Sequence, residues 1–289
     1  MASAPFFALV AGAGPGTGRA VALRFAKAYP VVVLARSPES YSDIVTEIKK
    51  AGGHALGIST DIVDPASVNS AFETIKKELP GSKLAAAVYN VSGGFARKPF
   101  LELTAEELDG GLDVAVRGFS RFAQNSLPLL LESVPESPNP PSLLITGATA
   151  SVKGSALFGS FAAGKFALRA LGQSLAREFG PQGVHVAHII VDGIIDIPRT
   201  KHFTTASSAE DAKLKPEAVG LIIIQMPHDQ KANSPSIDCR DLLAFAHSAS
   251  FSIHAGDRHS TICGKVLTKP RCYVFLRRRR GIIKHGLRL

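Results

Sequence analysis

The segment from Ala11 to Ala20 constrains the fold of this chain most strongly, because it sets closely spaced glycines between two segments of different periodicity. A short apolar, strand-like run precedes it at Phe6–Val10, and a helix-like run follows it to Tyr29. Glycine permits a sharp turn and a close approach of the backbone, and the first turn of a helix offers free N–H groups to an anion. The glycine spacing alone would also fit a tight turn. In this strand–loop–helix context it predicts a pyrophosphate cradle for a dinucleotide, formed by Gly12, Gly14, Gly16, Thr17 and Gly18.

Strand-like and helix-like segments alternate through the first two thirds of the chain. The predicted strands are Phe6–Ala11, Val31–Arg36, Ala55–Ser59, Ala85–Asn90, Ser142–Thr146 and Val184–Val191. The predicted helices are Gly18–Ala28, Ser40–Ala51, Ala66–Leu79, Ala105–Leu131 with a break near Gly110 and Gly111, and Ser160–Phe179. Such alternation implies βαβ crossovers and therefore a doubly wound α/β fold, with a central parallel sheet covered by helices on both faces. Ligands of such sheets bind where the carboxyl ends of the strands meet.

Charge and cysteine are distributed unevenly along the chain. Residues 1–200 carry 18 Lys/Arg and 17 Asp/Glu, whereas residues 201–289 carry 15 and 7, together with all three cysteines. A nucleic-acid partner is therefore not expected for the nearly neutral first part, and the four arginines at 277–280 favour a solvated tail over a polyanion site. The cysteines lack metal-ligand spacing, so we expect no metal and a cytoplasmic protein. The apolar run at 6–10 is too short for a signal peptide, and no stretch is long enough to span a membrane.

The residues after the second predicted strand indicate which nucleotide is bound. An acidic side chain there would bind both ribose hydroxyls and repel a 2′-phosphate, but the chain has Arg36 and Ser37 instead. A guanidinium pairs with phosphate and a hydroxyl adds a donor, so NADP (NADPH) is favoured over NAD. A solvated arginine at a strand end is the alternative. Asp61, after the third strand, fits either an acceptor for the adenine amino group or an ordinary loop carboxylate.

Three motifs together resemble those of the short-chain dehydrogenase/reductases over about residues 5–200. They are Gly12-x-x-x-Gly16-x-Gly18, Asn90-Val91-Ser92-Gly93 after the fourth strand, and Phe161-x-x-x-Lys165 at the start of the last long helix. The resemblance implies a seven-stranded Rossmann sheet and hydride transfer between NAD(P) and a carbonyl or alcohol. It also implies that Asn90 orders the turn on the ribose side and that Lys165 holds the nicotinamide ribose and supplies positive charge. A solvated helix lysine is the alternative role of Lys165.

The chain departs from the family's pattern at the catalytic positions. Phe161 stands where the family has its proton-donating tyrosine, Ala148 where it has a serine, and Ala115 where it has an asparagine. A shift of one residue would place Thr149 in the serine position. Carbonyl reduction needs an acid for the developing oxyanion, and neither phenylalanine nor alanine supplies one. A bound water or a nearby hydroxyl could replace it; the hydroxyls are those of Thr146, Thr149, Ser151, Ser155 and Ser160.

After the sixth predicted strand the resemblance weakens. The family has a Pro-Gly turn and then a threonine for the nicotinamide amide; here Gly193 keeps the turn and Ile195 leaves only its backbone for that contact. Leu221–Gln225 is strand-like, and Thr261–Leu267 is similar to the family's last strand. We expect a dinucleotide-binding and catalytic domain at 1–200, followed at 201–289 by a substrate loop and a divergent basic tail. The jump in charge, cysteine and histidine leads to the hypothesis that residues after about 220 come from an altered reading frame, which sequencing the transcript tests.

The sequence thus predicts an NADP(H)-dependent oxidoreductase with a degenerate active site, acting on a small carbonyl or alcohol. One alternative is a catalytically inactive NADP-binding sensor or partner subunit, which the three replaced catalytic positions favour. Another is a protein that binds polyanions or membrane surfaces through its basic tail. Apolar side chains on two long helices fit either a homo-oligomer interface or ordinary core packing; they are Phe119, Phe122, Phe166 and Leu168.

Overall fold

The computed structural model describes residues 5–93, 95–203, 213–228, 252–254 and 273–277. The strands are β1 (Phe6–Ala11), β2 (Val31–Ala35), β3 (Ala55–Ser59), β4 (Lys83–Tyr89), β5 (Ser142–Ala148), β6 (His185–Asp192), β7 (Ser252–His254) and β8 (Tyr273–Arg277). The helices are α1 (Thr17–Phe25), α2 (Ser42–Lys50), α3 (Pro65–Glu78), α4 (Ala105–Leu112), α5 (Phe119–Ser133), α6 (Gly159–Phe179) and α7 (Pro216–His228). A π-helical turn, Asp113–Gly118, joins α4 to α5. Short 3₁₀ turns occur at Pro38–Ser40, Phe100–Glu102, Thr149–Ser151, Gly180–Gln182 and Pro198–Thr200.

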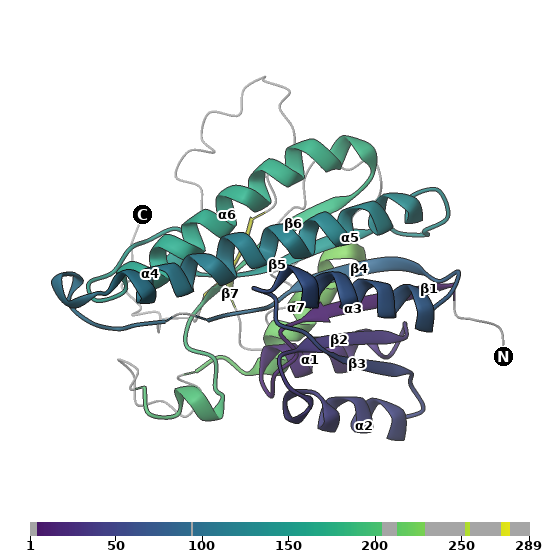
Figure 1. Ribbon diagram of the computed structural model, residues 1–289, viewed down its shortest axis with the longest axis horizontal. Helices are drawn as coiled ribbons and strands as arrows, with labels where there is room; N and C mark the ends of the chain where they lie inside the picture. The colour runs from purple at the N-terminus through teal and green to yellow at the C-terminus, as the bar shows by residue number, and fades with distance from the viewer. Residues whose placement is uncertain (1–4, 94, 204–212, 229–251, 255–272, 278–289) are drawn as a thin grey trace, which may run out of the picture.

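Within the described residues the strands form one sheet in the order β3-β2-β1-β4-β5-β6-β8-β7. The strands from β1 to β6 and β8 pair in parallel, whereas β7 runs antiparallel to β8 at the edge. The chain winds outward from β1 to β3 and then in the other direction from β4 to β6, so the strand order reverses between β1 and β4. This is the doubly wound, Rossmann-like α/β fold that the sequence predicts. The loops that follow the parallel strands gather where the carboxyl ends of these strands meet (Figure 1).

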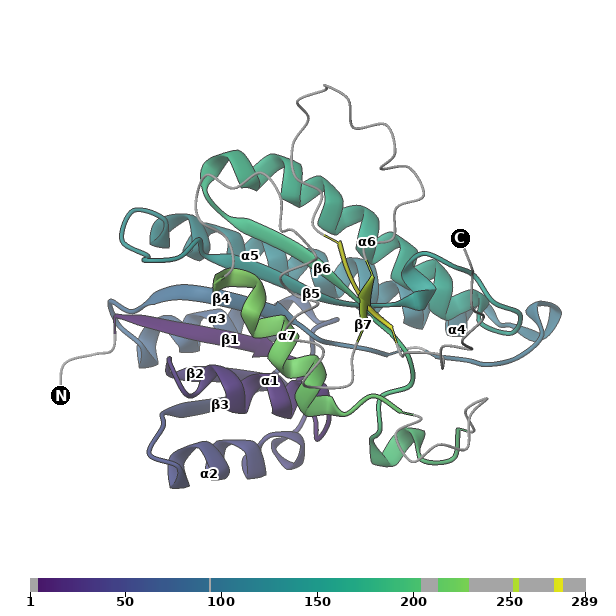
Figure 2. The same ribbon diagram turned by 180° about the vertical axis from the view of Figure 1, so that it is seen from behind.

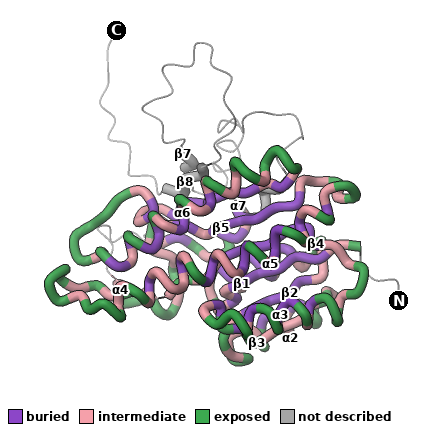
Figure 3. The backbone as a smooth tube through the Cα atoms, turned by 45° about the horizontal axis from the view of Figure 1, so that its top comes forward, coloured by how far each residue is buried: buried purple, intermediate pink, exposed green. Residues whose placement is uncertain are grey.

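Helices cover both faces of the sheet, because successive residues of a strand point to opposite sides. On β1, Ala8 and Val10 belong to the apolar layer under α1, α2 and α7, whereas Phe7 and Leu9 belong to the layer under α3, α5 and α6. Figure 1 shows α5 and α6 in front of the sheet, and Figure 2 shows α7 and α1 from behind. Buried residues concentrate along the strands between these helical layers (Figure 3).

The helix predicted at Ala105–Leu131 is interrupted near Gly110 and Gly111, as expected, but not at the glycines themselves, because α4 continues through both to Leu112. Glycine serves close helix packing here, since a Cβ at Gly164 of α6 would lie 3.0 Å from the Gly111 carbonyl oxygen. The helix changes instead at the π-helical turn 113–118, where the Tyr89 hydroxyl donates a 2.6 Å hydrogen bond to the Val114 carbonyl oxygen. A side-chain hydroxyl that hydrogen-bonds to a helix carbonyl oxygen in this way accounts for the local change of helix geometry.

Leu221–Gln225 is part of helix α7, so its prediction as a strand-like segment is wrong. Helix α7 approaches α1 so closely that a Cβ at Gly220 would lie 3.0 Å from the backbone carbonyl carbon of Ala20. Val219 and Ile223 join the core on this face, and their burial outweighs the strand preference of the isoleucine run.

Part of the segment 201–289 extends the same sheet. β8 pairs in parallel with β6, in a register that runs from His188 opposite Tyr273 to Asp192 opposite Arg277. The segment Thr261–Leu267, predicted to be similar to a last strand, and arginines 278–280 lie outside the described residues.

The four apolar side chains that fitted either an oligomer interface or the core differ in their burial. Phe119, Phe122 and Leu168 are buried in the layer under α5 and α6, so core packing holds for them. Phe166 is 42% exposed on α6.

Candidate functional site

The glycine loop between β1 and α1 leaves no room for side chains at two positions. Gly12 has a φ of +85°, which glycine adopts readily, and a Cβ there would lie 2.7 Å from the Asn90 backbone. A Cβ at Gly18 would lie 2.1 Å from the Gly12 carbonyl oxygen. Asn90 holds the loop from the end of β4, because its Nδ2 donates a 3.0 Å hydrogen bond to the Gly12 carbonyl oxygen. The loop is thus folded tightly against the ends of β1 and β4, where the strand order reverses.

Helix α1 begins at Thr17 without a side-chain cap, because its N-cap residue is Gly16. The first N–H groups of a helix have no partner inside it and attract anions. Gly14, in the loop, is partly exposed, and nothing lies within 4 Å of a Cβ built on it. An uncapped helix end beside a bare backbone fits a dinucleotide pyrophosphate, which needs donors and no intervening side chain.

Arg36 and Ser37 directly follow β2, at the same edge of the sheet as the glycine loop. The Arg36 side chain is exposed, and the Ser37 hydroxyl lies 3.5 Å from that of Ser40. Asp61 follows β3, and its Oδ1 accepts a 3.0 Å hydrogen bond from the Val63 N–H, as loop carboxylates commonly do. The roles of these side chains toward a 2′-phosphate or an adenine stay predictions.

Lys165 lies in the second turn of α6 and is only 8% exposed. Its Nζ donates a 3.1 Å hydrogen bond to the Thr146 carbonyl oxygen on β5 and stands 5.9 Å from the centre of the Phe161 ring. Burial lowers the pKa of Lys165 to about 8, since desolvation disfavours the ammonium form. An amine that exchanges its proton near neutral pH can take part in proton transfer.

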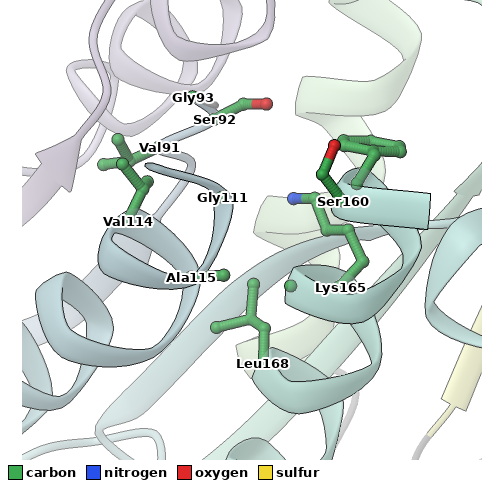
Figure 4. Close-up of a pocket in the computed structure, with 11 residues that line it drawn as sticks. Val91, Ser92, Gly93, Gly111, Val114, Ala115, Ser160, Lys165 and Leu168 are labelled. Atoms are coloured by element: carbon green, nitrogen blue, oxygen red, sulfur yellow. The ribbon is translucent and has the colours of Figure 1, made fainter. Parts of the chain in front are cut away.

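Lys165 lines a pocket between α6, the π-helical turn after α4 and the loop after β4. About 270 Å³ of space lies between the atoms, part of it open to solvent. Ser92 and Gly93 line it from the loop, Val114 from the π-helical turn, and Ser160 and Phe161 from α6. Figure 4 shows Ser160 and Lys165 on one side of the pocket and Ser92 and Val114 on the other.

Aromatic side chains gather beside this pocket. The rings of Phe161 and Phe95 meet at 76° with their centroids 5.3 Å apart, and Phe95 also lies 5.4 Å from the ring of Phe158. The Arg97 guanidinium lies over the Phe158 ring at 5.7 Å. We call Phe95, Phe158 and Phe161 the aromatic cluster. It places apolar surface, rather than an ionisable ring, one helical turn before Lys165.

The other positions predicted to have lost catalytic side chains lie near the same pocket or at the end of β5. Ala115 lines the pocket, and a Cβ at Gly164 would lie 3.2 Å from its Cβ. Ala148 ends β5, and its N–H donates a 3.1 Å hydrogen bond to Ser151 Oγ. Thr149 is already engaged, because its hydroxyl donates a 2.6 Å hydrogen bond to a carboxylate oxygen of Asp192. That these positions correspond to the family's catalytic ones stays a prediction.

His188 is a buried polar residue that the sequence reasoning missed. It lies on β6, is 3% exposed, and neither ring nitrogen has a hydrogen-bond partner among the described residues. Its ring packs on Gly147 of β5, where a Cβ would lie 2.2 Å from Cε1. Burial, together with the positive charge of Lys165, lowers the pKa of His188 to about 3, so the ring is neutral. The apolar residues around His188 in the sequence do not indicate that it is buried without a hydrogen-bond partner.

Gly193 and Ile195 follow β6, as predicted for the turn on the nicotinamide side. The backbone of Ile195 pairs with Leu214, and its carbonyl oxygen accepts a hydrogen bond from the Thr200 hydroxyl. The Ile195 contact with a carboxamide stays a prediction.

The described part of the chain has neither a candidate membrane span nor a candidate metal site. None of its helices is both long and apolar enough to cross a membrane. Its His, Cys, Asp and Glu side chains form no group that could hold a metal ion.

The model of the short chain dehydrogenase family matches residues 7–207, which is most of the chain. The chain belongs to the short-chain dehydrogenase family. It is therefore a member of an oxidoreductase family that acts on small molecules. A short-chain dehydrogenase/reductase of Armillaria gallica is 29% identical over 231 residues, which is 77% of this chain and 84% of that protein. An NADPH-dependent pterin aldehyde reductase of Arabidopsis thaliana is 27% identical over 175 residues, 59% of this chain and 67% of that protein.

Solved structures of short-chain dehydrogenases have the same fold. One from Rhodopseudomonas palustris is 29% identical, with a TM-score of 0.63 over 78% of this chain and 94% of that one. One from Burkholderia cenocepacia, in complex with NADP, is 24% identical, with a TM-score of 0.66 over 76% of this chain and 89% of that one. At this identity the second structure is a likeness of fold alone.

Proposed function

We propose that this short-chain dehydrogenase is an NADP(H)-dependent oxidoreductase with a degenerate active site, which interconverts a small carbonyl compound and its alcohol. The observation that carries the proposal is the glycine loop, in which Gly12 and Gly18 leave no room for a side chain beside an uncapped helix end. In this family such a loop supports binding of a nicotinamide dinucleotide. We assign cofactor contacts to Gly12, Gly14, Gly16, Thr17, Gly18, Arg36, Ser37, Asp61, Asn90, Lys165, Gly193 and Ile195.

The choice of NADP over NAD rests on Arg36. Its exposed guanidinium follows β2 directly, where an acidic residue would be needed to select the unphosphorylated ribose. The Arabidopsis relative is named for its dependence on NADPH, which agrees with this choice.

The residues at the pocket would have different roles in the reaction. A bound reduced nicotinamide supplies hydride to the carbonyl carbon. Lys165 is assigned the ribose hydroxyls of that nicotinamide and a positive charge beside the developing oxyanion, since its Nζ commits only one hydrogen bond to the described protein. Phe161 has no ionisable proton, so another group has to protonate the oxygen.

Three further features concern the whole chain: its division into parts, its location and its oligomeric state. We propose that residues 1–200 bind the cofactor and carry the catalytic groups, while 201–289 contribute the substrate loop and a basic tail. A cytoplasmic location is proposed from the three cysteines without pairing pattern. A homo-oligomer would have to use surfaces other than Phe119, Phe122 and Leu168, which are buried within the chain.

Calorimetric titration of the full chain with NADPH and NADH tests the proposal, since the sequence has no tryptophan to report binding by fluorescence. We expect NADPH to bind at least tenfold more tightly than NADH. Arg36→Ala should weaken NADPH binding by about 10- to 100-fold, the value of a hydrogen bond to a charged group, and leave NADH binding unchanged.

Arg24→Ala is the matched control, because Arg24 is also an exposed arginine but lies in the last turn of α1. It should leave both affinities unchanged. Absence of binding of either nucleotide would refute the proposed function. An equal loss in both arginine variants would refute the role of Arg36.

A further inference from the structure

Ser160, the second residue of α6, is fully buried, and its hydroxyl lacks a partner. Its Oγ makes no hydrogen bond to any described residue. A buried hydroxyl without a partner destabilises a folded protein, so native structures keep few of them and each one requires an explanation.

The position of Ser160 supplies that explanation. Ser160 lines the pocket that Lys165 also lines, and Figure 4 shows the oxygen of the first and the nitrogen of the second on the same side of it. The Lys165 ammonium carries three protons and donates one of them to the Thr146 carbonyl oxygen. Donors on two side chains are therefore available to a ligand oxygen in this pocket.

The other hydroxyls nearby differ from Ser160 in burial, partner or position. Ser92 also lines the pocket, but it is exposed, so water can satisfy its hydroxyl. Thr149 donates its hydroxyl proton to Asp192 at 2.6 Å, and neither Thr149 nor Ser151 lines the pocket. Thr146 has an unpartnered hydroxyl, but its side chain does not line the pocket. Among these hydroxyls, Ser160 alone is buried, unpartnered and in the pocket wall.

We propose that Ser160 is the residue that binds the substrate's carbonyl oxygen in place of the missing tyrosine, with Lys165 as the proton donor. This inference rests on the proposed function. Ser160 Oγ–H donates a hydrogen bond to the oxygen and keeps its own proton. When the carbon has received hydride, the oxygen carries the former π pair of the carbonyl bond. It takes a proton from Lys165 Nζ, so that an N–H bond breaks and an O–H bond forms. The neutral amine then recovers a proton from water.

The substrate class follows from the wall of the same pocket. Phe161 lines it, and the aromatic cluster continues outward from Phe161 to Phe95, which is 44% exposed. Such a surface favours an apolar carbonyl compound with a ring, which can pack against aromatic edges and faces. Cyclohexanone and benzaldehyde are suitable probes.

Binding can be measured without turnover. The full chain is loaded with NADP+, which cannot reduce a ketone, and cyclohexanone and benzaldehyde are titrated with saturation-transfer NMR. We expect the wild type to bind at least one of them and Ser160→Ala to weaken that binding about tenfold or more. Ser126→Ala is the matched control: Ser126 is equally buried with an unpartnered Oγ, but it lies on α5 outside the pocket. Its binding should equal that of the wild type.

Turnover with NADPH gives the second measurement. Ser160→Ala should lower kcat for the same probes about 100-fold without changing KM for NADPH. Ser160→Thr keeps the hydroxyl and should retain most of the activity. Adding Phe161→Tyr to Ser160→Ala should restore activity, because the new phenol places a donor at the neighbouring position. The wild-type rate of reduction should fall as pH rises through about 8, where Lys165 loses its proton.

The results distinguish a wrong role for Ser160 from a wrong proposed function. Equal binding and equal kcat in Ser160→Ala and Ser126→Ala would overturn the role of Ser160. So would a wild-type protein that binds NADPH but neither probe, or a Ser160→Ala protein that melts well below Ser126→Ala and loses activity only for that reason. Failure of the wild type to bind NADPH would overturn the proposed function itself.

Discussion

Gly18→Ala should damage the protein more than any other single methyl group added to the glycine loop. The new Cβ would lie 2.1 Å from the Gly12 carbonyl oxygen and 2.8 Å from the Ala13 Cα. Both atoms belong to the backbone of a tight turn, so neither can rotate away as the end of a flexible side chain can. Relief requires the start of α1 to move by about 1 Å or more away from β1, to approach the ordinary contact distance of 3.4 Å.

The cost of that movement can be estimated. Added methyl groups in packed regions destabilise proteins by about 1–3 kcal/mol, and a clash with backbone on both sides belongs at the upper end. For a domain of this size, about 3 kcal/mol lowers Tm by about 6–12 °C. The same movement displaces the uncapped N–H groups of α1, so binding of NADPH should be lost as well.

Differential scanning calorimetry of the ligand-free protein measures the effect, with Gly14→Ala as the control for stability. A Cβ at Gly14 meets nothing within 4 Å, and its φ is not positive. The control should therefore leave Tm unchanged or raise it slightly, because alanine restricts the unfolded chain. A Gly18→Ala protein that melts within about 2 °C of the wild type, or a Gly14→Ala protein that falls as far, would refute the packing argument.

Two other predictions follow from buried groups on the same side of the sheet. Native Lys165 releases its proton near pH 8 and the unfolded chain near 10.5, so the unfolded state binds more protons between these values. Stability relative to Lys165→Met should thus rise by up to about 3 kcal/mol as pH increases from 8 to 10.5; a flat difference in urea midpoints would contradict this. Tyr89→Phe should cost about 1–2 kcal/mol in urea unfolding, because the Val114 carbonyl oxygen loses its 2.6 Å hydrogen bond. Tyr29→Phe removes a hydroxyl that makes no hydrogen bond to the described residues and should cost less; equal losses would count against the role of Tyr89.

Local signals in the sequence were sufficient for the fold class. The strand at Phe6–Ala11 has the same bounds in the structure as in its prediction, and so does Ala55–Ser59. These segments were readable because strand pairing in a doubly wound sheet needs only short apolar runs, separated by helices of suitable length. The glycine spacing and the placement of Lys165 near the start of a long helix were likewise visible, since both are fixed by residue identity and distance along the chain.

Predictions from local sequence failed where contact with a segment far away in the chain determined the secondary structure. The weak helix preference of Gly110 and Gly111 predicts an interruption near them, and α4 does end at Leu112, but close packing on α6 keeps the glycines themselves helical. The irregular turn that does occur depends on the Tyr89 hydroxyl, which arrives from β4. The isoleucines of Leu221–Gln225 have strand preference, yet packing on α1 makes that segment a helix.

By itself, then, the sequence determined the order of strands and helices from β1 to β6, the doubly wound sheet and the glycine loop, because these depend on periodicity and on residues close together in the chain. Tertiary structure alone decided which polar groups are buried without partners. Ser160 and His188 look ordinary in the sequence, since neither burial nor the lack of a hydrogen-bond partner is a property of neighbouring residues. Both depend on how α6 packs on β5 and β6, and that packing brings Ser160 and Lys165 into one pocket.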